Sequence, residues 1–276
     1  MEFERLFTIS AFEALRLTRL ALATVPDLRI EDCPAAVIAH TPAASAYDLE
    51  AAMHLHGIVT EDVSHESVTF YRECIIAVLL LKMPTFTKLM TRGRGRFIKS
   101  LDTNEFRDIL SVFREAHVLD EPPSNADVAW WDTIQGRVRL NNDQEVMARA
   151  RAAEKLSLEH EQAELVKLGI EQSPRWIAIE DNFVGYDVLS YRHTPEGVQT
   201  RLIEVKSTIA SPLRFIVTRN EWNTAEKVGD AYLFHVWDLA KSPPELFIRT
   251  VEQVRPHIPE DNEKGEWKSA SIPVGI

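Results

Sequence analysis

Residues 185–208 read GYDVLSYRHTPEGVQTRLIEVKST, and this stretch decides the fold of the C-terminal half. Both ends are rich in β-branched and aromatic residues, and the segment HTPEG at 193–197 between them is typical of a turn. We therefore predict a β-hairpin. Side chains two residues apart share one face of a strand, so Glu204 and Lys206 project together, away from their apolar neighbours.

The turn also predicts the register of this hairpin. Pairing Arg192 with Gln199 places Asp187 opposite Glu204, on the face that carries Lys206. The same register predicts two apolar pairs on the other face, Val188 beside Ile203 and Tyr186 beside Val205. A shift of one residue would destroy the arrangement.

Two carboxylates and an ammonium group on one face indicate metal-assisted chemistry. Two acids this close repel each other unless a cation neutralises them. Carboxylate oxygens suit Mg²⁺, which binds through one or two carboxylates together with substrate phosphate. A neighbouring lysine can orient the attacking water or stabilise charge that develops on phosphorus. The residues thus outline phosphodiester hydrolysis, while an exposed cross-strand ion cluster is the alternative interpretation.

A third acid, Glu154, lies on the helix predicted upstream of the hairpin. It shares a helix face with Leu158 and Leu165, and we expect this face to pack inward. Glu154 is therefore either solvated at the helix edge or aimed at a polar site. Glu159 and Glu161 are expected to point elsewhere, as ordinary surface charge.

These residues resemble a known family. Asp187 after Gly-Tyr, the triplet Glu204-Val205-Lys206 and the upstream helical glutamate resemble the PD-(D/E)XK restriction-endonuclease-like superfamily. More narrowly, four segments are similar to the C-terminal domain of NO VEIN-type proteins: ARAAE at 150–154, GYDVLS at 185–190, LIEVKST at 202–208 and FIVTRNE at 215–221. The triplet alone is a weak signal, because Glu266-Trp267-Lys268 repeats it in the polar tail.

The resemblance implies a site and a function. Asp187 and Glu204 would be metal ligands, Lys206 the catalytic lysine, and Glu154 the helical acid that completes the metal site. The implied cofactor is Mg²⁺ or Mn²⁺, the implied substrate is DNA, and the implied role is prokaryotic defence or DNA processing. Ala153 stands where the family usually has glycine, but alanine favours a helix and leaves the carboxylate in place. The alternative is a catalytically silent adaptor or DNA-sensing subunit of a larger complex.

The remaining sequence predicts an α+β or α/β protein: an α-helical N-terminal region, then a mixed sheet, which the resemblance implies is restriction-endonuclease-like. Residues 1–122 have apolar residues at helical spacing and are predicted to be an α-helical domain. We expect 123–144 to be a linker or lead-in, in which Asn141–Asp143 cap a long helix that runs to about Leu168. Residues 145–276 form the predicted nuclease-like domain, with strands at 175–180, 185–192, 200–208, 213–217, 231–238 and 246–251.

Two further segments are candidates for contact with nucleic acid. A basic run without acidic residues lies on a segment that contains two glycines and that we expect to be flexible. Such a segment suits contacts with a phosphate backbone, and a solvated loop is the alternative interpretation. Its cations are Lys88, Arg92, Arg94, Arg96 and Lys99. The second segment, TRNE at 218–221, matches a helix capping box. We expect a structural role for Glu221, whereas Arg219 and Asn220 at the helix N-terminus could meet a phosphate.

Composition excludes several classes of protein. The 276 residues carry a formal net charge of −11, and neither half of the chain is basic, which excludes a polybasic nucleic-acid binder. The longest apolar run, Ile75–Leu81, is too short to span a bilayer, and the first residues lack the pattern of a secretory signal. With only two cysteines, we expect a reduced, cytoplasmic protein. Its helical N-terminal domain could hold a protein partner or a second copy.

Overall fold

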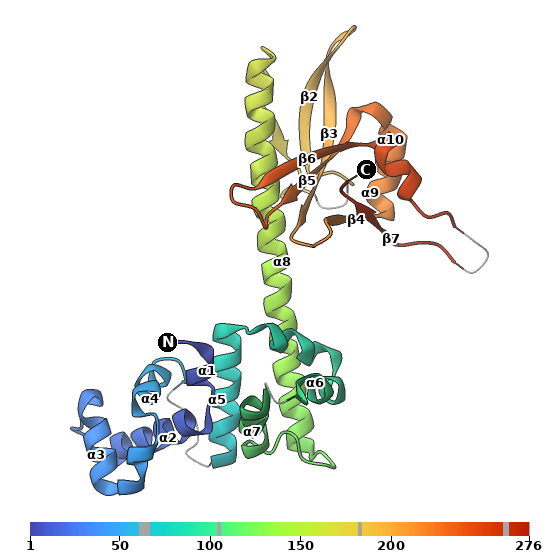
Figure 1. The fold of residues 1–276 in the computed structure, drawn as a ribbon. Helices are drawn as coiled ribbons and strands as arrows, with labels where there is room; N and C mark the ends of the chain where they lie inside the picture. The colour runs from blue at the N-terminus through green and yellow to red at the C-terminus, as the bar shows by residue number, and fades with distance from the viewer. Residues whose placement is uncertain (61–66, 104–105, 182–183, 262–264, 276) are drawn as a thin grey trace. The chain divides into compact units, whose positions relative to one another are not determined.

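The computed structural model describes residues 1–60, 67–103, 106–181, 184–261 and 265–275. The chain divides into two compact units, Met1–Asp143 and Gln144–Ile276. Helices build the first unit, and a mixed sheet dominates the second (Figure 1). The α+β class predicted from the sequence is thus confirmed.

The first unit is a set of helices packed around aromatic side chains. Its helices are α1 (Phe3–Leu6), α2 (Ile9–Thr24), α3 (Cys33–His40), α4 (Leu49–His56), α5 (Ser67–Lys82), α6 (Arg94–Leu101) and α7 (Arg107–Glu115). Short 3-10 segments join them at η1 (Ile30–Asp32), η2 (Pro42–Ala46) and η3 (Thr85–Arg92). The rings of Phe113 and Trp131 each lie 5.3 Å from the ring of Phe97. Edge-to-face packing of this kind stabilises a core beyond the area that it buries.

The apolar run Ile75–Leu81 belongs to α5, and its side chains Ile75, Val78 and Leu79 are buried in this core. In the described part of the chain, no single helix has the length and apolar character needed to cross a membrane. The segments Val68–Lys82 and Thr85–Arg92, bent by 118°, pass that test only as a pair, by length and composition.

Helix α8 (Asn125–Lys167) begins sixteen residues or more before the predicted cap at Asn141–Asp143. The expected linker 123–144 is therefore mostly helix. Ser124 and Asp127 account for the early start, because the backbone amide of each donates to the side chain of the other, at 2.7 and 3.2 Å. The first turns of α8 then bury Trp130 and Trp131 in the core of the first unit.

The second unit contains a five-stranded sheet in the order β1-β2-β3-β5-β6. Its strands are β1 (Arg175–Trp176), β2 (Val188–Thr194), β3 (Gly197–Thr208), β5 (Tyr232–Asp238) and β6 (Glu245–Thr250). Only β3 and β5 pair in parallel, and the other neighbours are antiparallel. A separate pair, β4 (Arg214–Thr218) and β7 (Ser269–Pro273), accompanies α9 (Arg219–Val228), α10 (Val251–Val254) and the 3-10 turns η5 (Gly229–Ala231) and η6 (Arg255–His257).

The hairpin β2–β3 has the predicted register. Arg192 pairs with Gln199 and Val188 with Ile203, and the Asp187 amide donates to the Ile203 carbonyl at 2.9 Å. Tyr186 is a correction: it precedes the strand and packs with the core on the opposite face from Val188. The alternation of side chains fails there because β2 begins only at Val188.

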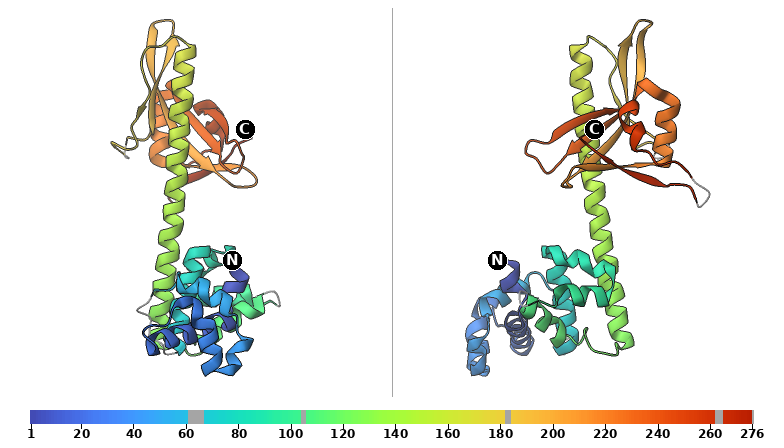
Figure 2. Two further views of the ribbon diagram at one scale, coloured as in Figure 1. Left: turned by 90° about the vertical axis from the view of Figure 1, so that its left-hand side faces the viewer. Right: turned by 45° about the vertical axis from the view of Figure 1, so that its right-hand side comes forward.

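The sheet separates two cores. The second half of α8 covers one face, where Ala153 packs against Ile203 and Val205 (Figure 2). On the other face, α9 and the β4–β7 pair cover Tyr232 and Phe234. Because neighbouring residues of β3 point to opposite faces, Glu204 and Lys206 lie on the α9 side.

Candidate active site

Asp187 is held in place by the backbone around it. Its carbonyl accepts from the amides of Ile177 and Ala178, and its Oδ2 accepts from the amide of Val205 at 2.7 Å. Gly185, two residues earlier, has a φ of +79°, and a Cβ there would collide with Thr224 on α9. The segment Gly-Tyr-Asp therefore needs glycine so that the helix can pack against the start of β2.

Glu204 and Lys206 form the centre of the site. Glu204 is 4% exposed, and its Oε1 lies 2.7 Å from Nζ of Lys206. The same ammonium lies 2.8 Å from Oε2 of Glu221 on α9. One buried cation is thus paired with two carboxylates from two different elements.

Glu221 is the site residue that sequence reasoning missed. The predicted capping box is present: the Glu221 amide donates to Thr218 Oγ1, and the Thr218 amide donates to Glu221 Oε2 at 2.9 Å. The oxygen that closes the box also binds Lys206. A capping-box glutamate turns back over the first turn of its helix, and here this turn faces β3. The sequence held one signal, the location of TRNE within a segment similar to the family.

Glu154 is buried at the sheet edge, 7% exposed. Its Oε2 accepts from the Trp176 indole at 2.5 Å and lies 2.7 Å from the Arg151 guanidinium. It lies near enough to Asp187 to raise the pKa of that carboxyl. Of the two outcomes left open by the sequence, the structure supports the polar site over the solvated helix edge.

Burial sets the protonation of these groups. Loss of solvent raises the pKa of Asp187 to about 6, although the Val205 amide and Lys206 oppose the shift. Burial also raises the pKa of Glu204 to about 8, despite Lys206 and with the help of the charge on Asp187. Burial alone would lower the pKa of Lys206, but Glu204 and Glu221 outweigh it and keep the ammonium charged. Lys206 likewise outweighs burial at Glu221 and lowers the pKa of that carboxyl.

The donor set of the site fits a hard divalent cation. Glu204 is buried and Asp187 is half-buried, and a cation shared by the two carboxylates would remove the repulsion between them. Among the residues that the structure describes, no three histidine, cysteine, aspartate or glutamate side chains are grouped as a metal-binding set. Glu154 instead faces Trp176 and Arg151. Asp187 and Glu204 are thus the two residues that would hold a cation, and Glu154 stands beside the pair.

The predicted basic segment is helical, not a flexible loop. Gly93, at a φ of +98°, ends η3 and begins α6, which Phe97 and Leu101 anchor in the core. Arg94 is used internally, donating to Glu121 at 2.5 Å and to the Asp120 carbonyl at 2.8 Å. Lys88 is exposed on η3.

The other cations of this run differ from Arg94. Arg92, Arg96 and Lys99 are exposed, and their charged groups have no partner within the part of the chain that the structure describes. They are therefore available for a phosphate backbone.

Of the two residues predicted to meet a phosphate at α9, Arg219 has an internal role and Asn220 is exposed. The Arg219 guanidinium binds Asp261, donates to the Trp267 carbonyl at 2.8 Å, and lies 4.6 Å from the centre of the Trp267 ring. The Asn220 carbonyl accepts from the Thr224 hydroxyl at 3.1 Å. Arg219 thus ties α9 to the chain before β7.

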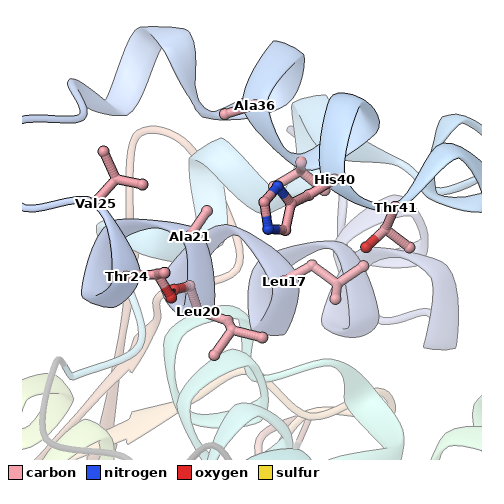
Figure 3. Close-up of a pocket in the computed structure, with 9 residues that line it drawn as sticks. Leu17, Leu20, Ala21, Thr24, Val25, Ala36, His40 and Thr41 are labelled. Carbon is pink, nitrogen blue, oxygen red and sulfur yellow. Dashed lines mark hydrogen bonds between the residues drawn. The ribbon is translucent and has the colours of Figure 1, made fainter.

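An apolar pocket of about 320 Å³ lies between α2 and α3 (Figure 3). Leu17, Leu20 and Ala21 line it from α2, and Val37 and His40 from α3. None of the predicted site residues lines this pocket, so it plays no part in the chemistry considered above.

Comparison with known families finds a similarity within the second unit. Residues 153–249 match the family described as Protein NO VEIN, C-terminal. This confirms the resemblance to the NO VEIN C-terminal family. The matched segment contains Glu154, Asp187, Glu204, Lys206 and Glu221. No curated protein and no solved structure matches the chain.

Proposed function

We propose that this protein is a metal-dependent nuclease that hydrolyses phosphodiester bonds of DNA with a PD-(D/E)XK-type site, in prokaryotic defence or DNA processing. One observation carries the proposal: Lys206 is paired with Glu204 and Glu221, and Oδ2 of Asp187 accepts from the amide of Val205, the residue between Glu204 and Lys206. The match to the NO VEIN C-terminal family supports a nuclease-like, DNA-related role.

Each residue has a role in this proposal. Asp187 and Glu204 would hold Mg²⁺ or Mn²⁺, which when bound polarises a phosphoryl oxygen and lowers the pKa of water. Lys206 orients the attacking water and stabilises negative charge at phosphorus. Glu221 positions Lys206, and Glu154 adds negative charge beside Asp187. Hydrolysis joins the water oxygen to phosphorus and breaks the bond to the leaving oxygen, which takes up a proton.

The helical unit offers contacts for the substrate. Arg92, Arg96 and Lys99 present three charges without internal partners, and such cations bind phosphates without reading sequence. The net charge of −11 means that the affinity must come from local contacts and will fall with salt. A protein partner or second copy bound to the helical unit stays a prediction.

A silent DNA-binding or adaptor subunit is the second candidate. It is favoured by the internal bonds of the acids: Asp187 with the Val205 amide, Glu204 with Lys206, and Glu154 with Trp176. In that case, the same network would stabilise the fold without chemistry.

A cleavage assay separates the two. Purified protein is incubated with plasmid or linear DNA and Mg²⁺ or Mn²⁺, with EDTA as a blank. We expect cleavage that Lys206→Ala abolishes and that Lys268→Ala leaves unchanged, because exposed Lys268 ends the other Glu-x-Lys triplet. Identical products from all three proteins, or DNA binding with no cleavage under any condition, would contradict the nuclease and favour the silent subunit.

A further inference from the structure

Helix α8 carries a buried polar stripe on the face that packs against the sheet. Glu154, Ser157 and Glu161 follow each other at i, i+3 and i+7, and their exposed fractions are 7%, 0% and 3%. The sequence analysis placed Glu161 on the surface, and that expectation is wrong. Glu159, two residues away, is the exposed one.

Three of the side chains in this region form a directional hydrogen-bond chain. The Trp237 indole can only donate, and its Nε1 donates to Oγ of Ser157 at 2.8 Å. The Ser157 hydroxyl therefore keeps its own hydrogen for Nδ1 of His235, which lies 3.3 Å away.

The hydrogen-bond chain ends at the ring. Nε2 of His235 lies 3.5 Å from Oε1 of Glu161 and makes no hydrogen bond within the residues that the structure describes. Burial of His235 lowers its pKa to about 3, with contributions from His160 and Arg201, so the ring is neutral near pH 7. Strand β5 and helix α8 are thus joined through Trp237, Ser157 and His235.

We propose that Ser157 and Trp237 are positioning residues that, with His235, fix the rotation of α8 against β5 and thereby hold Glu154 beside Asp187. This inference rests on the proposed function. Apolar packing tolerates a small rotation or slide of a helix, whereas a buried hydrogen bond such as that from Trp237 to Ser157 forms in one arrangement only. Each residue along a helix turns by about 100°, so even a fraction of that step would take Glu154 away from Trp176.

The readout is metal affinity in the full-length protein. Mn²⁺ binding is followed by electron paramagnetic resonance of the free ion at pH 7.5, and thermal unfolding by circular dichroism checks the fold. We expect Ser157→Ala to weaken Mn²⁺ binding by about tenfold, the low end of the loss seen when an outer-shell partner is removed. Glu161→Gln leaves the hydrogen bond from Trp237 to Ser157 in place and should bind Mn²⁺ within about twofold of wild type, as should the matched surface control Glu159→Ala.

A double-mutant cycle separates positioning from a general structural role. If Ser157 acts through Glu154, then Ser157→Ala should change nothing further in a Glu154→Gln background. Additive losses would instead overturn the positioning role, as would equal Mn²⁺ affinity of Ser157→Ala and Glu159→Ala. If Ser157→Ala does not fold, Trp237→Phe against Glu159→Ala makes the same comparison, since phenylalanine cannot donate to Ser157.

The wild-type protein distinguishes the two levels of failure. If the wild-type protein binds Mn²⁺ and Ser157→Ala binds it equally well, the positioning role is contradicted and the nuclease proposal is unaffected. Wild type without measurable Mn²⁺ binding contradicts the proposed function and the inference together.

Discussion

The chain contains two Glu-x-Lys triplets, and only one lies in a site. Glu204 and Lys206 lie in the second half of β3, where Glu204 is buried, Lys206 is half-buried and Glu221 of α9 adds a third charge. Glu266 and Lys268 are exposed, and the Lys268 carbonyl accepts from the Arg219 amide at 3.0 Å. The difference teaches that this motif acquires chemistry from burial beside other charges, because solvent screens the same groups at the surface.

Loss of Asp187 should have the largest effect on the buried triplet. Asp187→Asn keeps an oxygen for the Val205 amide but removes a ligand charge, so we expect cleavage to fall by roughly 10²–10³-fold or more. The metal-free protein should gain on the order of 1–3 kcal/mol of stability at pH 8, since asparagine avoids the cost of a buried charge. Cleavage kinetics and urea unfolding check this. A loss of both activity and stability would mean that Asp187 is structural.

The pH dependence should differ between the two triplets. Burial raises the pKa of Asp187 to about 6 and of Glu204 to about 8, so the folded protein holds protons that the unfolded chain releases. Metal-free stability from these groups is present at low pH and is lost as the pH rises through about 6 and then about 8.

Metal binding should follow the opposite trend, because Mg²⁺ or Mn²⁺ requires the deprotonated acids. Mn²⁺ affinity should rise by at least tenfold between pH 6 and pH 8.5, while Glu266→Gln leaves the profile unchanged. A flat profile in wild type would show that the two carboxylates are already ionised at pH 6.

Glu221 can be compared with a matched capping box. Thr250 and Gln253 close the same box on α10, far from Lys206 in sequence, and no lysine or arginine among the described residues pairs with the Gln253 side chain. We expect Glu221→Ala to cost about 1 kcal/mol of stability and to reduce cleavage by about tenfold, because it removes both a cap and a partner of Lys206. Gln253→Ala should cost similar stability and leave cleavage unchanged. Equal cleavage activity of the two variants would show that Glu221 acts only as a helix cap.

The smallest effect concerns the basic run, where the comparison is between two arginines. Arg96 is exposed without a partner in the described ranges, whereas Arg94 bonds to Glu121 and two carbonyls. In fluorescence anisotropy with the Lys206→Ala protein, Arg96→Ala should reduce the slope of log affinity against log salt by about one. Arg94→Ala should affect stability and leave that slope unchanged. The reverse result would place the phosphate contact at Arg94.

Much of the fold was predictable because local patterns agree with tertiary packing. The register of β2–β3 follows from a short turn and alternating side chains, and the structure confirms it. The sequence places the start of α8 too late because its cap, Ser124 with Asp127, lies directly after Pro122 and Pro123, and prolines favour a break in the chain. Both halves of that cap are local, so the signal was present in the sequence.

The site residues on the hairpin could be predicted from the sequence, whereas those contributed by the helices packed against the sheet could not. Asp187, Glu204 and Lys206 follow from strand periodicity, which acts over two or three residues. Glu221 and Glu161 do not, because their burial depends on which helix covers which face of the sheet. The sequence around a glutamate at a helix cap or within a helix does not show whether its carboxylate faces solvent or a buried partner.

Two features of this protein can be read from its sequence. One is the order of its elements, with helices before strands, and the other is the register of a hairpin that brings two acids and a lysine to one face. Only the tertiary structure decided which charges are buried together. It placed Glu221 on Lys206, turned Glu161 toward His235, and left Glu266 and Lys268 in solvent. This difference follows from the sequence separation over which each effect acts. Periodicity and turns act within a few residues, whereas desolvation and charge pairing depend on elements that meet only in the folded chain.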